Sequence, residues 1–167
     1  MKRALFVIDV QNYFMNPLTK DLPEKIRRYV KKNKNKFELI IFTNFVNTPQ
    51  SSVYRFLDWT ECLTSPETDI VNELNSVLRY GIVVAKDVLS ALKIPKIKNL
   101  LAEKRIEEIY LSGIDTDCCV LATAYDAFDE GYRVRLLEKI CMTSTGKNLH
   151  NAAVSMFKKN VGSVIED

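Results

Sequence analysis

The strongest constraint on the fold is an alternation of short apolar runs with stretches of helical periodicity along the whole chain. Five runs rich in Val, Ile, Leu, Phe or Tyr have the length of strands. Several are apolar throughout, as expected for strands that are covered on both faces. The runs are Ala4–Ile8, Leu39–Phe42, Ile82–Ala85, Ile109–Leu111 and Val134–Leu137, with a weaker sixth at Val164 and Ile165.

The segments between these runs carry apolar residues at helical spacing. Pro23 suits a first helical position, and Thr68 or Asp69 suits a cap. The predicted helices are Pro23–Lys32, Thr68–Leu78, Pro95–Lys104, Thr116–Glu130 and Asn148–Lys159. Because right-handed crossovers join parallel strands, the pattern predicts an α/β fold with three layers: a doubly wound, mostly parallel sheet of about six strands with helices on both faces.

The composition fits one soluble globular domain. A chain of 167 residues has the length of a single unit, so we expect residues 1–167 to form one domain. Hydrophobic residues make up 47% and charged residues 27%, a mixture that argues against disorder. No apolar stretch approaches the roughly 18 residues of a membrane span, and the run at Ala4–Ile8 is too short for a signal peptide. We therefore expect no membrane partner.

Charge and cysteine content exclude further classes. The 24 basic and 21 acidic residues give a net charge of +3. The basic residues cluster between Arg27 and Lys36 without an aromatic platform, which favours a solvated helix face over a nucleic-acid surface. The four cysteines lack metal-type spacing, and without a signal peptide their even number does not imply disulfides. We expect a reduced, cytoplasmic protein.

Three chemically active residues follow predicted strands. Asp9 ends the first strand, Lys86 ends the third, and the segment from Gly113 to Cys119 follows the fourth and opens a helix. Since ligands of open parallel sheets bind beyond the carboxyl ends of the strands, an acid, a base and a thiol are expected at one edge. The lysine and the helix start favour the thiolate, and the carboxylate is able to accept its proton.

Each of these residues also has a structural explanation. An Asp at a strand end commonly caps a turn, a Lys there is commonly solvated, and a Cys in an apolar helix commonly packs in the core. On residue types alone, the catalytic and the structural interpretations stay open. Their common position at one edge of the sheet is what favours catalysis.

Three segments resemble the isochorismatase-like cysteine hydrolases, which include nicotinamidases and N-carbamoylsarcosine amidases. The stretch GIDTDCCVLATAYDA, from Gly113 to Ala127, is similar to the family signature G-hydrophobic-x-T-x-x-C-V-x-x-T-A-x-D-A. ALFVIDVQNYF is similar to the first strand with its catalytic aspartate, and KDVLSAL is similar to K-x-x-x-S-A-F. The segments occur in the family order over nearly the whole chain.

The resemblance implies residue roles. Asp9, Lys86 and Cys119 take the positions of the catalytic triad, with Cys119 rather than Cys118 as the nucleophile. It also implies a cis peptide bond between Ile114 and Asp115, held so that the amides of Asp115 and Cys119 form an oxyanion hole. Many relatives are dimers or tetramers, so a homo-oligomer is expected by resemblance.

The sequence departs from the metal-binding relatives. Nicotinamidases hold a metal through an Asp-x-His…His group, whereas this chain has a single histidine, His150, which we expect on a helix surface. We therefore expect no metal and no other cofactor. The candidate substrate-binding residues are Gln11, beside the catalytic aspartate, and Phe14, Arg55 and Trp59, which precede or lie in the long irregular stretch Asn44–Pro66.

These features predict a hydrolase that cleaves a small-molecule amide or related C–N bond through a thioester. Two alternatives remain open at this stage. One is vinyl-ether hydrolysis of the isochorismatase type, in which the acid does most of the work. The other is a thiol-based sensing or binding domain that uses Cys118 and Cys119 without turnover.

Overall fold

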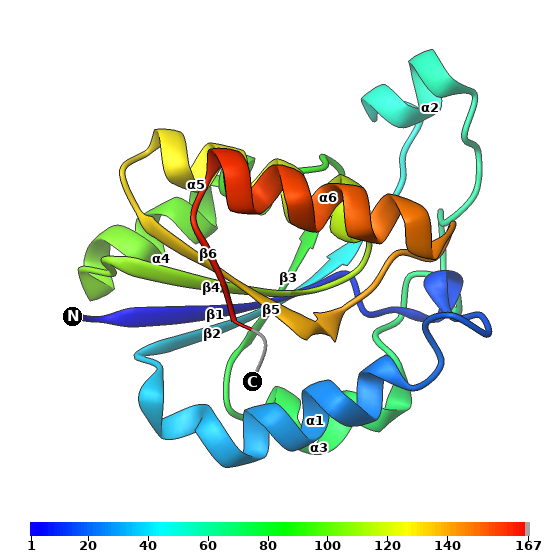
Figure 1. The fold of residues 1–167 in the computed structure, drawn as a ribbon. Helices are drawn as coiled ribbons and strands as arrows, with labels where there is room; N and C mark the ends of the chain where they lie inside the picture. The colour runs from blue at the N-terminus through cyan, green and yellow to red at the C-terminus, as the bar shows by residue number, and fades with distance from the viewer. Residues whose placement is uncertain (166–167) are drawn as a thin grey trace.

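The computed structural model describes residues 1–165 and confirms the α/β architecture (Figure 1). Its six strands form one parallel sheet in the order β3-β2-β1-β4-β5-β6. The strands are β1 (Arg3–Ile8), β2 (Leu39–Phe45), β3 (Ile82–Lys86), β4 (Glu108–Gly113), β5 (Arg133–Cys141) and β6 (Ser163–Ile165). The weak apolar pair at Val164 and Ile165 is thus a short edge strand.

Helices cover both faces of the sheet, so the three-layer prediction is also confirmed. In Figure 1, α4, α5 and α6 lie above the sheet, and α1 and α3 lie below it. The helices are α1 (Leu22–Asn33), α2 (Ser52–Leu57), α3 (Asn75–Leu78), α4 (Pro95–Lys104), α5 (Leu121–Asp129) and α6 (Lys147–Asn160). The basic residues predicted for the first helix lie on α1 or just after it, half-buried or exposed.

The central strand shows why the runs are apolar throughout. Ala4, Phe6 and Ile8 pack in the cluster that includes the helices above the sheet, whereas Leu5 and Val7 pack in the cluster with α1 and α3. All five residues are at most 1% exposed. Since side chains alternate between the two faces of a strand, covering both faces requires an unbroken apolar sequence.

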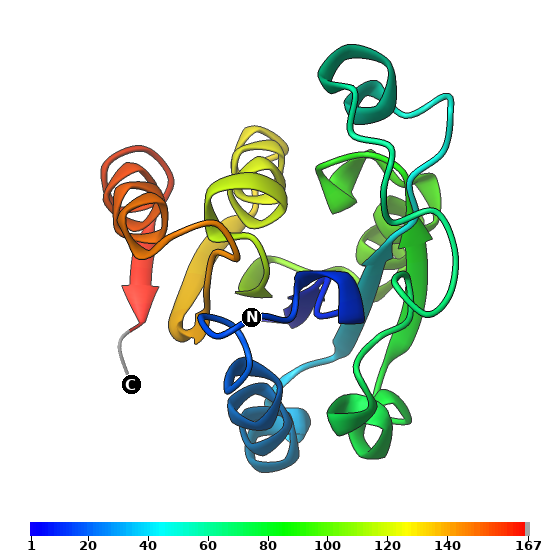
Figure 2. The same ribbon diagram turned by 90° about the vertical axis from the view of Figure 1, so that its right-hand side faces the viewer.

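The strand order locates the place where a ligand can bind. The chain moves outward from β1 to β2 and β3, and then returns to start β4 on the other side of β1. The loops that leave β1 and β4 therefore turn to opposite faces and leave a crevice between them. Asp9 directly follows β1, and the signature segment begins at the end of β4. Figure 2 shows this end of the sheet toward the viewer.

The predicted helix Thr68–Leu78 is wrong over its first half. The main chain of Asp69 and Val71 instead pairs with the segment after β1: Asn12 N–H donates to Asp69 O at 3.0 Å, and Val71 N–H donates to Val10 O at 3.2 Å. Helical structure begins only at Asn72, with one 3₁₀ turn before α3. Tertiary hydrogen bonds have therefore overridden a local helical pattern.

Two other expectations need correction. The helix predicted to start at Thr116 begins with a π-helical turn, Thr116–Val120, before α5. His150 is buried rather than on the surface. Its Nδ1 lies 2.9 Å from Thr116 Oγ1, and this contact connects α6 to that turn.

The irregular stretch after β2 contains the short helix α2, which stands out beyond the carboxyl ends of the strands (Figure 1). Within residues 1–165, no helix combines the length and the apolarity needed to cross a bilayer.

Candidate active site

The turn after β1 fixes the carboxylate of Asp9. This residue has a φ of 50°, in the left-handed region that Asp and Asn tolerate better than most residues. Its N–H donates to Thr43 O at 3.1 Å, and the Thr43 hydroxyl donates to Asp9 Oδ1 at 2.7 Å. The side chain is fully buried. The end of β2 therefore orients the carboxylate.

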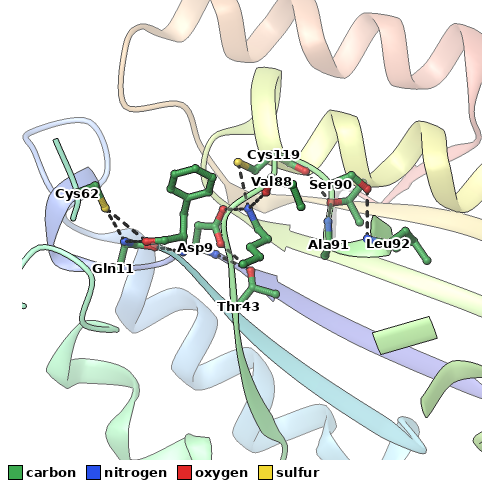
Figure 3. Close-up of polar contacts among 12 residues, drawn as sticks. Asp9, Gln11, Thr43, Cys62, Val88, Ser90, Ala91, Leu92 and Cys119 are labelled. Atoms are coloured by element: carbon green, nitrogen blue, oxygen red, sulfur yellow. Dashed lines mark hydrogen bonds and ion pairs between the residues drawn. The ribbon is translucent and has the colours of Figure 1, made fainter. Parts of the chain in front are cut away.

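Lys86, the last residue of β3, joins the acid to the thiol. Its Nζ lies 2.7 Å from Asp9 Oδ2, 3.0 Å from Val88 O and 3.5 Å from Cys119 Sγ. The contacts with Val88 O and Cys119 Sγ are hydrogen bonds, and the contact with Asp9 is an ion pair. Figure 3 shows Asp9 and Cys119 approaching each other from different elements. The Phe45 ring centroid lies 4.9 Å from the same nitrogen.

The loop after β4 presents Cys119. Gly113 has a φ of 115°, and a Cβ there would stand 2.1 Å from Ile8 O, so only glycine allows β1 and β4 to approach this closely. The next peptide bond, Ile114–Asp115, is cis, as the family resemblance implied. Val120 N–H then donates to Asp115 O at 3.1 Å across the π-helical turn that carries Cys119. Such turns recur at functional sites.

The pKa of Cys119 is shifted in the direction opposite to that expected from the sequence. The pKa of Cys119 is raised well above that of a free thiol. The causes are the hydrogen bond between Cys119 and Cys118, the burial of the thiol and the negative charge of Asp9. Burial opposes the charge of Lys86, but Asp9 and Cys119 outweigh it and raise the pKa of the ammonium. Both directions favour the protonated forms, a thiol at Cys119 and an ammonium at Lys86.

A cavity of about 520 Å³ opens at Cys119. The described residues that line it are Tyr13, Phe14, Asn16, Phe45, Val53, Leu57, Trp59, Leu89, Asp115, Cys118, Cys119, Ser144 and Thr145. The structure thus brings the predicted Phe14 and Trp59 to the same cavity as the thiol. Asp9 and Lys86 have no exposed side-chain surface and do not line the cavity, so the ion pair lies behind the sulfur.

Two predicted substrate-binding residues lie elsewhere. Gln11 is fully buried and joins the segment after β1 to the end of β2: its amide nitrogen donates to Phe45 O at 2.9 Å and its amide oxygen accepts from Phe45 N–H at 2.7 Å. Arg55 is exposed on α2, where its guanidinium lies 5.0 Å from the Phe56 ring centroid. Neither residue is among those that line the cavity.

Sequence reasoning missed several residues of the site. Thr43 is a polar residue within the apolar second strand, which was a usable signal. Ser144 follows β5, so the rule that ligands bind beyond strand ends could have found it. Its N–H and hydroxyl donate to the two oxygens of Asp115 at 2.6 and 3.0 Å, and its carbonyl accepts from Asn16 at 2.7 Å.

Burial raises the pKa of Asp115 from its usual 3.8 to about 6, against the opposing hydrogen bonds from Ser144. Between these two values the native state holds more protons than the unfolded state, so this carboxyl lowers the stability as the pH rises. We expect Asp115→Asn to gain stability relative to the unmodified protein from pH 4 to pH 7. Chemical denaturation across this range would measure it, and a constant difference would contradict it.

Within residues 1–165, no cluster of three or more His, Cys, Asp or Glu side chains is arranged to hold a metal ion. The amide of Asp115 donates to no partner among the described residues, and Asp115 lines the cavity. The site therefore offers a thiol, an ion pair and a main-chain N–H group around one cavity. These are the groups that acyl transfer requires.

Known proteins share the fold and the sequence pattern. The isochorismatase domain model matches residues 3–167. An isochorismatase family protein of Bacillus subtilis, PncA, is 36% identical over 67 residues, which cover 40% of this chain and 36% of that relative. The crystal structure of nicotinamidase PncA from Bacillus subtilis superposes with a TM-score of 0.87 at 21% identity, covering 100% of both chains. That of N-carbamoylsarcosine amidase from Thermoplasma acidophilum gives 0.85 at 22%, also covering 100% of both. The match over nearly the full length shows that the chain belongs to the isochorismatase family of hydrolases.

Proposed function

We propose that the protein hydrolyses a carboxamide or related C–N bond of a small molecule, with Cys119 as the nucleophile. The observation that carries this proposal is the position of one buried ammonium, Lys86 Nζ, 2.7 Å from Asp9 and 3.5 Å from Cys119. Two structural neighbours are named for amide cleavage, a nicotinamidase and an N-carbamoylsarcosine amidase, which supports the same bond type here.

The first half of the reaction forms a thioester. The Cys119 thiol passes its proton to the Asp9 carboxylate while its sulfur attacks the carbonyl carbon. The carbonyl oxygen becomes an oxyanion, and the unpartnered N–H of Asp115 is a donor for it. When the C–N bond breaks, the leaving nitrogen takes the proton back from Asp9. The raised pKa of the thiol makes this base necessary.

The second half consumes water. Asp9 accepts a proton from the water as its oxygen attacks the thioester carbon, and the C–S bond breaks. The sulfur then recovers that proton, so the carboxylic acid product leaves and the resting thiol is restored. Lys86 keeps its charge throughout, and its Nζ contacts both the Asp9 carboxylate and the Cys119 sulfur. Because it never transfers a proton, its raised pKa suits this role.

The thioester is the species that tests the proposal. Ammonia release from a set of small amides, ureas and carbamoyl compounds identifies a turned-over compound. The protein is then mixed with that compound, quenched in acid within milliseconds to seconds, and digested. We expect the acyl group on the peptide that contains Cys119. Turnover without an acyl adduct on any cysteine would contradict the nucleophilic mechanism and favour acid-driven chemistry.

A further inference from the structure

The cavity beside Cys119 has an unbalanced charge. Asp115 is the single charged side chain among the described residues that line it. Behind the sulfur, the charges of Asp9 and Lys86 cancel within one ion pair. Arg55, the cation expected to pair with a substrate carboxylate, is exposed on α2 outside the lining. An anionic substrate group would therefore meet a carboxylate and no partner of opposite charge.

Aromatic rings form one wall of the cavity. Trp59 lies at its centre, with ring centroids 5.4 Å from Tyr13, 6.5 Å from Phe14 and 5.5 Å from Phe45. The polar atoms of two of these rings are already paired, because Trp59 Nε1–H donates to the Tyr13 hydroxyl, which donates to Glu61. The wall therefore offers π surface rather than free hydrogen-bonding groups. Such surfaces attract cations through the negative faces of the rings.

Asp115 has acceptor capacity left for a ligand. An ionised carboxylate has about four lone-pair positions. Ser144 fills one on each oxygen, with its N–H at 2.6 Å and its hydroxyl at 3.0 Å. The same two bonds fix the orientation of the carboxylate at the cavity wall, so a ligand does not have to order it. A cavity lined by both a fixed carboxylate and a cluster of aromatic rings suits an organic cation.

We propose that the cavity selects amide substrates that carry a positively charged group, such as an alkylammonium, with the Asp115 carboxylate as counter-ion and the rings around Trp59 as the apolar wall. The amide part of this inference rests on the proposed function, whereas the preference for a cation is a property of the cavity itself. Asp115 acts here as a specificity residue, separately from any role of its main-chain N–H.

Three matched benzamides test the preference: one with a trimethylammonio group, its neutral isostere with a tert-butyl group, and one with a carboxylate, each in the meta and para series. Binding is measured by calorimetry on the full-length Cys119→Ala protein, so that turnover does not interfere. We expect the cation to bind at least about tenfold more tightly than the isostere, and the anion most weakly.

Asp115→Asn, added to that protein, keeps the shape but removes the charge: its amide oxygen still accepts from Ser144 N–H, and its amide nitrogen donates to the Ser144 hydroxyl oxygen. It should reduce the preference to about threefold or less, the part contributed by the rings alone. Asp117→Asn is the matched control, because Asp117 accepts from Thr143 at 2.6 Å and does not line the cavity. It should leave the preference unchanged.

Equal binding of the cation and its isostere, or no measurable binding of the cation at millimolar concentration, overturns the inference. So does an unchanged preference in the Asp115→Asn protein. Ammonia release by the protein with Cys119 intact is scored separately. A cation preference without hydrolysis of any amide would support the selectivity and contradict the proposed function, whereas hydrolysis without the preference would do the reverse.

Discussion

On the proposed mechanism, Cys119→Ala protein is expected to release ammonia from an amide substrate at least about four orders of magnitude more slowly than the unmodified protein, since loss of the nucleophile removes the covalent route entirely. The variant should remain folded, because alanine fits the space of a thiol that is 6% exposed. Steady-state ammonia release measures the rate, and circular dichroism checks the fold.

Cys118→Ala is the matched control for this prediction. Cys118 is the adjacent residue and lines the same cavity, but Lys86 Nζ contacts the sulfur of Cys119. We expect the Cys118 variant to keep its activity within about tenfold, since it loses on the order of 1 kcal/mol of wall contact, and loss of the Cys118 hydrogen bond lowers rather than raises the pKa of Cys119. If Cys119→Ala retained full activity, or if the two variants were equally impaired, Cys119 would not be the nucleophile.

Lys86→Met is expected to lower the free energy of unfolding by about 3–5 kcal/mol, because it leaves the buried Asp9 carboxylate without its counter-ion. Methionine replaces most of the aliphatic volume, so the loss reports the charge rather than a cavity. The two side chains of the pair are both 0% exposed and their charged atoms are 2.7 Å apart. Urea unfolding followed by circular dichroism measures the change.

Lys98→Met is the control, because Lys98 Nζ also lies 2.7 Å from a carboxylate, that of Glu130, but this pair is partly exposed. Water screens such a pair, so the same substitution should change the stability little. Adding Asp9→Asn to Lys86→Met should recover most of the lost stability, since asparagine tolerates the φ of 50° and carries no charge. Absence of recovery would mean that the ion pair is not the source of the loss.

Most strands and helices could be predicted from the sequence, because the periodicity of apolar residues within a segment is a local signal. All six apolar runs became strands, and the helix predicted for Pro95–Lys104 matches α4 residue for residue. The failure at Thr68–Leu78 has a non-local cause: the main chain around Ile70 pairs with Gln11, 59 residues earlier, and no periodicity within the segment records this. Likewise, nothing in the α6 sequence shows that His150 meets Thr116.

The sequence predicted that an acid, a base and a thiol meet at one edge of the sheet, but not how closely their side chains approach one another. The rule for parallel sheets predicted that Asp9, Lys86 and Cys119 lie at one edge, and the family resemblance assigned their roles. Distances between side chains from three separate elements depend on strand order and on register. Of the candidate substrate-binding residues in the long loop, Trp59 lines the cavity and Arg55 does not. The position of a loop residue depends on tertiary contacts, which its neighbours in the sequence do not encode.

The sequence by itself determined the layered architecture, since the period of apolar residues decides which faces a strand or helix must bury. It also determined which acid, base and thiol follow the strands. Only the tertiary structure decided that one ammonium lies between Asp9 and Cys119, that the pKa of the thiol is raised rather than lowered, and that Asp115 lies in the cavity lining. These properties arise from burial and from contacts between distant segments, which exist only once the chain has folded.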